Sequence, residues 1–344
     1  MSDFLKRARQ LSIRILTAIS QTFFVSNPWA GLAVIATLAI AGPHLAVAGL
    51  VVSVLARWTG ERLHAAQTLL DTGLIELNGW FLGLACASFF SLGPGLVVAV
   101  VIGGPLVAVF SIAMRRVLAT WDVPLLVGPY IPVFWLLWSA LSALPWVHGA
   151  ALLVRAPPPD SAFLVVLFGG LRGIGQIFFL PDARVGFVIA LSASIADRRI
   201  GPAMIAASIA SGGVGYLARA PLWLVDQGLG GFMPALVAAA ALSRFAGLGP
   251  AAVAVAVVAG PFLEIAAVRL AGAAGLYALS AGYVGFVWLF ALLRPVRQAA
   301  DARSGWSMKG QPLLLETSRS PDAVRADTHQ SRPWPWKRRR QSQG

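Results

Sequence analysis

Two stretches of the sequence place an amide side chain three residues before an aromatic ring, just ahead of a helix break. They read "SQTFFVSNPWAG" (residues 20–31) and "LRGIGQIFFLPDARVG" (residues 171–186). At this spacing Gln21 and Phe24, and likewise Gln176 and Phe179, lie near one face of a helix. The Pro, Asn and Asp residues that follow interrupt the helix and free backbone carbonyls. Rings beside free carbonyls would suit a small, planar, neutral amide, although core phenylalanines followed by interfacial turns would give the same pattern.

The other polar residues do not form a recognisable enzyme or metal site. The four histidines lie in or beside expected loops, without Cys or carboxylate residues at metal-ligand spacing: His44, His64, His148 and His329. The "SGGVG" at residues 211–215 lacks the Lys-Ser/Thr pair of a phosphate loop and indicates close helix packing. Glu264 lies inside an apolar segment, where an acid either serves function or pairs with a group such as Arg269. Glu76 and Asp122 lie at segment ends, where we expect their side chains to reach the membrane interface. We therefore expect no enzyme activity, no cofactor and no metal.

The elements that must position these residues are membrane helices. The chain has 344 residues, of which 58% are hydrophobic and 12% charged, and its mean hydropathy is +0.75. Soluble domains are about one-quarter charged, so the recurring uncharged runs predict an all-α polytopic membrane protein. A lone Cys86 excludes a disulfide framework. The basic N-terminus resembles a signal peptide, but Arg14 interrupts its apolar run, so we expect it to be retained.

The apolar segments fall into two groups of six. We expect them at 5–24, 29–41, 44–57, 77–92, 94–114 and 123–150, and at 162–180, 185–196, 202–218, 229–243, 250–268 and 274–293. The predicted organisation is therefore a first repeat over 1–150, a Pro-rich joint outside the cytoplasm over 151–161, a second repeat over 162–294, and a basic, disordered cytoplasmic tail over 295–344.

Four sets of residues recur at nearly one offset, which indicates an internal repeat. The offsets run from 153 to 156 residues for Gln21 and Gln176, Gly73-Leu74 and Gly228-Leu229, Gly104-Pro105 and Gly260-Pro261, and Leu126 and Leu279. If five segments of each group cross the membrane, 22 of the 27 basic residues lie on the cytoplasmic side. The net charge of +13 then reflects orientation rather than nucleic-acid binding. An odd number of crossings inverts the second repeat, and inverted repeats enclose a substrate path at their interface.

With these features the sequence resembles the urea transporter family over about residues 5–295. "LRGIGQIFFL" is similar to that family's RGIGQV-F stretch, and "FFVSNPWAGL" to its N-N-P-W-T-G-L stretch. The signature G-L-Y-G-F-N-G-x-L-x-G is matched by "GLIELNGWFLG" (residues 73–83) and "GLGGFMPAL" (residues 228–236). The signature L-T-x-P-F is matched by "LVGPY" (residues 126–130) and "LSAGY" (residues 279–283).

The resemblance implies passive, channel-like permeation of urea through a homotrimer with one pore per subunit. The Ala-, Gly- and Arg-rich composition and the lack of a disulfide framework suit a bacterial inner membrane. Each subunit would contain two inverted repeats of five crossings, each with a pore half-helix. The implied pore residues form two slots and a centre between them. The first slot contains Gln21, Phe24, Leu77 and Phe81, and the second contains Gln176, Ile177, Phe179, Phe232 and Leu236. The centre contains Val127 and Ser280. The chain departs from the signatures at Leu77, Val127 and Met233, which replace Phe, Thr and Asn, and at Glu76, which replaces Gly.

Three other functions stay open at this point. A relative could carry another small amide, ammonia or water instead of urea. A proton-coupled transporter could use Glu264. A non-conducting membrane scaffold could bind anionic lipid or a partner through its basic tail.

Overall fold

A computed structural model of the chain describes residues 2–150 and 159–304. These residues form helices and no named strand, with one isolated β-bridge between Phe90 and Gly149. Residues 1–295 form one compact unit, and the second unit, from Val296, is described only as far as Ser304. Most of the predicted Pro-rich joint and the tail after residue 304 lie outside the described residues.

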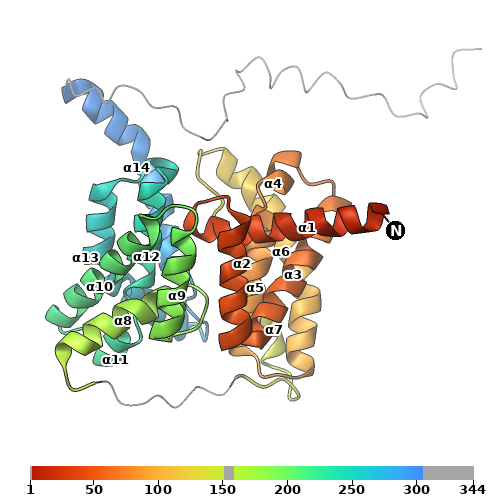
Figure 1. Cartoon of the computed structure of the whole chain (residues 1–344), viewed down its shortest axis with the longest axis horizontal. Helices are drawn as coiled ribbons and strands as arrows, with labels where there is room; N and C mark the ends of the chain where they lie inside the picture. Colours follow the sequence, from red (N-terminus) through yellow and green to blue (C-terminus); the bar gives the residue numbers. More distant parts are fainter. Residues whose placement is uncertain (1, 151–158, 305–344) are drawn as a thin grey trace, which may run out of the picture. The chain divides into compact units, whose positions relative to one another are not determined.

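The α-helices before and after the joint follow one another in corresponding order (Figure 1), whereas the two 3-10 helices, η1 and η2, lie at different places in the two halves. In the first half they are α1 (Ser2–Ser20), η1 (Gln21–Phe23), α2 (Pro28–Ala41), α3 (Pro43–Arg62), α4 (Gln67–Asp71), α5 (Leu74–Phe89), α6 (Pro94–Ala119) and α7 (Tyr130–Leu141). In the second half they are α8 (Ala162–Gln176), α9 (Ala183–Ser194), α10 (Ile200–Leu217), α11 (Leu222–Asp226), α12 (Phe232–Leu242), η2 (Phe245–Gly247), α13 (Pro250–Ala273) and α14 (Ala281–Ser304). Each half therefore begins with a broken helix and contains a very short helix before its central one.

Local sequence explains where several of these helices begin. Asn27 caps α2, since its side chain accepts hydrogen bonds from two backbone N–H groups of the first turn, and Asp182 caps α9 in the same way. Proline occupies the first position of α2, α3, α6 and α13, where its missing N–H costs no helical hydrogen bond. The expected segment 123–150 is much shorter than predicted, because residues around it form turns and only Tyr130–Leu141 is helical.

Glycines let the central helices of each half approach closely. A Cβ at Gly83 of α5 would lie 2.6 Å from the Cα of Gly49 in α3. In the second half, a Cβ at Gly215 of α10, within the "SGGVG" stretch, would lie 3.3 Å from Pro261 of α13. The predicted close helix packing at this stretch is therefore confirmed. In the first half, α3, α5 and α6 lie side by side (Figure 1).

Three of the described helices are long and apolar enough to cross a membrane: Pro94–Ala119, Ile200–Leu217 and Pro250–Ala273. A fourth crossing is possible by length and composition if the pair Arg9–Phe23 and Pro28–Ala41, bent by 86°, counts as one span. Six further apolar helices are shorter, with 10–17 residues. The predicted total of ten crossings stays a prediction, whereas an all-helical fold with several apolar helices is confirmed for the described residues.

Candidate functional site

The two helix breaks have nearly the same backbone geometry. Phe24 has φ 60° and Phe179 has φ 62°, both in the left-handed region that non-glycine residues seldom adopt. The N–H of Phe24 donates to the carbonyl of Gln21 over 2.9 Å, and that of Phe179 to the carbonyl of Gln176 over 3.0 Å. Strained backbone of this kind persists where its surroundings hold it, and it concentrates at functional sites.

Each glutamine side chain is tied to the backbone ahead of the next central helix. Nε2 of Gln21 donates to the carbonyl of Thr72, and Nε2 of Gln176 donates to the carbonyl of Gln227 over 3.3 Å. The residue after each acceptor is a glycine with φ +71°. Gly73 supplies the left-handed residue directly before α5, and Gly228 supplies the same conformation four residues before the start of α12 at Phe232. Each amide therefore holds the break of its half against the turn that precedes the central helix of the same half.

Ring contacts pair each break with the opposite half of the chain. The ring of Phe24 lies 4.6 Å from that of Phe245 between centroids, and η1 packs against α12. In the other direction, Phe179 meets Phe89 at the end of α5, with centroids 6.0 Å apart. The neighbouring Phe178 stacks on Phe81 at 5.9 Å. These ring contacts cross between the halves, whereas the Gln21 and Gln176 amides bind the backbone of their own half. The grouping of each break with the central helix of its own half, which the resemblance implied, stays a prediction.

The remaining slot residues are buried on the two central helices. Leu77 and Phe81 lie one turn apart on α5, and Phe232 and Leu236 one turn apart on α12. All four side chains are at most 5% exposed, and Ile177 in the second break is 4% exposed. Residues four apart share one face of a helix, so each central helix presents an aromatic and an aliphatic side chain together.

The two centre positions lie in turns of the same shape. Val127 and Ser280 each follow a leucine with positive φ, which is 51° at Leu126 and 52° at Leu279. Asn78 holds the first turn: Nδ2 donates to the carbonyl of Leu126 over 2.9 Å, and Oδ1 accepts from the N–H of Tyr130 over 3.2 Å.

In the second half, Met233 stands 155 residues after Asn78 and cannot make these hydrogen bonds. Its turn is held by side chains of the first half instead. Trp135 Nε1 donates to the carbonyl of Tyr277 over 2.8 Å, and the hydroxyls of Tyr130 and Ser280 are 2.7 Å apart. No residue pattern predicted this bond between Tyr130 and Ser280.

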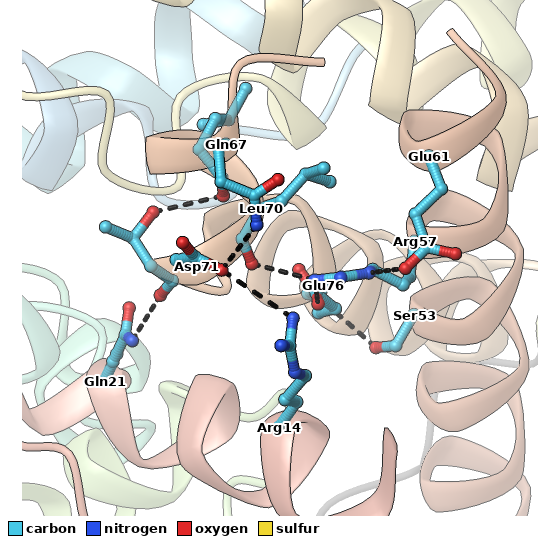
Figure 2. Close-up of polar contacts among 11 residues, drawn as sticks. Arg14, Gln21, Ser53, Arg57, Glu61, Gln67, Leu70, Asp71 and Glu76 are labelled. Atoms are coloured by element: carbon cyan, nitrogen blue, oxygen red, sulfur yellow. Dashed lines mark hydrogen bonds and ion pairs between the residues drawn. The ribbon is translucent and has the colours of Figure 1, made fainter. Parts of the chain in front are cut away.

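A buried ion pair supports the start of α5 (Figure 2). Arg57 on α3 donates to Oε1 of Glu76 over 2.9 Å, to the carbonyl of Leu70 over 2.8 Å and to Glu61 over 2.6 Å. Glu76 is 1% exposed, and Ser53 donates to its backbone carbonyl over 2.9 Å. The prediction that Glu76 reaches the membrane interface is wrong, because Arg57 gives its carboxylate a buried partner.

The second half carries a different ion pair near its short helix. Arg172 of α8 donates to both the carboxylate and the backbone carbonyl of Asp226. Asp71 is the equivalent residue in the first half, and its Oδ1 lies 3.8 Å from Nη1 of Arg14 (Figure 2). Both side chains of this pair are more exposed than those of Arg172 and Asp226. The positions 155 residues after Arg57 and Glu76 are occupied by Gly212 and Gly231. The Arg57 network therefore has no counterpart in the second half. The two halves therefore stabilise equivalent turns with different charges.

Glu264 lies on α13 and is 5% exposed. Oε2 lies 3.7 Å from the position that a Cβ would take at Gly282, two residues after Ser280. Within the described ranges the carboxylate has no hydrogen bond or ion pair, and Arg269 is exposed rather than paired with it. Across the same residues, no group of three or more His, Cys, Asp or Glu side chains could hold a metal ion.

Comparison with known proteins assigns this arrangement to a family. The family model described as "Urea transporter" matches residues 13–295. Urea transporter 1 of Ovis aries is 28% identical over 173 residues, or 48% of this chain and 45% of the sheep protein. Urea transporter 1 of Mus musculus is 32% identical over 119 residues, or 34% of this chain and 31% of the mouse protein. The aligned region thus spans less than half of these relatives. Because the family match covers most of the sequence, including both breaks and both centre turns, this multi-pass membrane protein belongs to the urea transporter family.

Proposed function

We propose that this protein carries urea passively across the membrane, as a channel-like path, without a cofactor. The observation that carries the proposal is the pair of matching breaks, each with an amide, a left-handed phenylalanine and a ring contact from the other half. Rings offer apolar faces to a flat solute and backbone carbonyls accept from its N–H groups. Family membership and the printed function of the mammalian relatives support urea as the solute.

The proposed path runs between two inverted repeats, over residues 1–150 and 162–294. The matched order of helices and the paired positive-φ residues support a repeat. The charge distribution supports five crossings per repeat, with both termini in the cytoplasm. The Ala-, Gly- and Arg-rich composition supports a bacterial inner membrane as the location. The short apolar helices favour burial against neighbouring subunits, in line with a homotrimer.

The proposed slots are assembled across the halves. Phe24 and Gln21 would line one slot with Phe232 and Leu236, since η1 packs against α12. The other slot would combine the second break (Gln176, Ile177 and Phe179) with Leu77 and Phe81 of α5, since Phe178 and Phe179 contact rings of that helix. Val127 and Ser280 would form the centre between them.

Tracer uptake into proteoliposomes tests passive permeation against proton coupling. We expect [14C]urea uptake above that of empty liposomes at equal pH on both sides, with no acceleration by an imposed proton gradient. Glu264→Gln should leave uptake within about twofold of the wild type, because a passive path needs no titrating group. Uptake that requires a proton gradient and disappears in Glu264→Gln would establish the coupled alternative. If no flux of urea, other small amides, ammonia or water were detected, the non-conducting scaffold would be the remaining alternative.

Phe232→Ala is expected to impair discrimination between urea and larger amides. The variant removes a ring that is 5% exposed and contributes one face of a proposed slot. Aromatic contacts contribute about 0.5–1.5 kcal/mol beyond area burial, so the urea-to-N-methylurea permeability ratio should fall roughly twofold to tenfold. Phe163→Ala removes a ring that is 70% exposed and serves as the matched control. An unchanged ratio in Phe232→Ala, at equal amounts of folded protein, would show that the slot is assigned wrongly.

A further inference from the structure

A hydrogen bond between two side chains joins the halves at the centre turns. The Tyr130 hydroxyl lies 2.7 Å from Oγ of Ser280, and the backbone N–H of Ser280 donates to the same tyrosine oxygen over 3.2 Å. Tyr130 is 0% exposed, whereas Ser280 is partly exposed. The tyrosine therefore lies behind the serine, and the serine is the more accessible of the two.

The geometry decides which hydroxyl has a proton to spare. Either hydroxyl could donate over this distance, but among the described residues Oγ of Ser280 is the only acceptor that the buried Tyr130 hydroxyl reaches, so the tyrosine proton is best used there. With Oγ accepting from tyrosine, the Ser280 hydroxyl proton points elsewhere. A serine hydroxyl otherwise rotates to suit any neighbour, and this contact fixes it as a donor.

Tyr130 is itself held in place from both sides. Its backbone N–H donates to Oδ1 of Asn78, which also holds the carbonyl of Leu126. Its ring stacks on Phe81 with centroids 5.6 Å apart and planes 30° apart, and Phe81 stacks in turn on Phe178. The phenol oxygen is therefore fixed relative to a proposed slot ring and to the second break.

Ser280 has particular need of such a partner in this chain. Val127, at the equivalent centre position, has no polar side-chain atom, so Ser280 supplies the side-chain hydroxyl of this pair. Its own half has Met233 where Asn78 braces the first turn. With only one side-chain hydroxyl at these two centre positions, the hydrogen bond to the solute is strongest if that hydroxyl always presents its proton to the solute.

We propose that Tyr130 is a positioning residue that orients the Ser280 hydroxyl as a hydrogen-bond donor to the carbonyl oxygen of the permeating amide. This inference rests on the proposed function. It makes Tyr130 specificity-determining for solutes with a strong oxygen acceptor, as in urea, over thiourea, whose sulfur accepts hydrogen bonds weakly. Tyr130 acts through Ser280 and does not itself touch the solute.

The test is a double-mutant cycle with urea and thiourea permeability measured in the same proteoliposomes. Tyr130→Phe and Ser280→Ala should each lower the urea-to-thiourea ratio by roughly threefold to tenfold, as loss of one hydrogen bond would. The double variant should match Ser280→Ala, because tyrosine has nothing to orient without the hydroxyl. Ser280→Thr keeps the hydroxyl and should retain the wild-type ratio.

Tyr283→Phe is the matched control. Tyr283 ends the equivalent motif 153 residues later and is 3% exposed, so the variant loses the same atom from an equally buried ring. Its ratio should equal that of the wild type. An unchanged ratio in Tyr130→Phe, or additive losses in the double variant, would overturn the inference. A wild-type protein without urea flux would instead overturn the proposed function, so the two failures are distinct.

Discussion

Arg57→Ala is expected to lower the free energy of unfolding by about 3–5 kcal/mol, the cost of leaving a buried charge unpaired. Glu76 is 1% exposed, and its second oxygen, Oε2, has no hydrogen-bond partner among the described residues, so Arg57 stabilises the charge of that carboxylate. The same arginine also holds the carbonyl of Leu70 ahead of the Gly73 turn (Figure 2). Thermal unfolding of the purified protein in detergent, followed by tryptophan fluorescence, measures the loss.

Two further variants separate the ion pair from general damage. Arg57→Met combined with Glu76→Leu removes both charges together and should recover most of the stability, since an apolar pair often replaces a buried ion pair without loss. Arg184→Ala breaks an ion pair with Asp182 whose arginine side chain is 91% exposed, and it should cost less than about 1 kcal/mol. If Arg57→Ala were as mild as Arg184→Ala, the buried network would not support α5 as described.

Gly186→Ala is expected to destabilise the protein by about 3 kcal/mol, at the upper end for overpacked sites. A Cβ at Gly186 on α9 would overlap the backbone carbonyl of Leu171 on α8. Backbone atoms cannot rotate away, so α8 and α9 would have to separate beside the second break. Gly31→Ala should behave alike, because a Cβ there would overlap the carbonyl of Leu16. Detergent melting temperature and the monodisperse fraction on gel filtration measure both effects.

Gly285→Ala provides the control for this pair. A Cβ at Gly285 of α14 would meet nothing within 4 Å, and alanine favours a helix over glycine by about 0.5–1 kcal/mol. This variant should be neutral or slightly stabilising. If Gly186→Ala also melted like the wild type, the close approach of the two helices at the break would be wrong.

Local chemistry in the sequence predicted much of the fold. Asn27-Pro28 and Pro181-Asp182 marked both breaks, and the recurrence of Gly73 and Gly228 marked equivalent positions, at which the structure places the same φ of +71°. These features depend on the conformations open to single residues, which the sequence specifies directly. The family resemblance is confirmed by the match over residues 13–295.

Contacts between segments that are distant in the sequence could not be predicted in the same way. The sequence placed Glu76 at the interface because nothing local revealed Arg57 as its partner. No residue pattern predicted the ring contacts across the halves, which join Phe24 to Phe245 and Phe179 to Phe89. Such pairings follow from how the halves pack, and residue spacing within one half carries no information about that packing.

Tracer exchange tests most directly the proposal that urea passes through this protein passively. Proteoliposomes holding the wild-type protein would be loaded with the same urea concentration and pH as the outside buffer, so that no net gradient exists. We predict that [14C]urea then enters and leaves at equal rates, well above those of empty liposomes. Exchange no faster than in empty liposomes, or exchange that appears only with a proton gradient, would contradict the account.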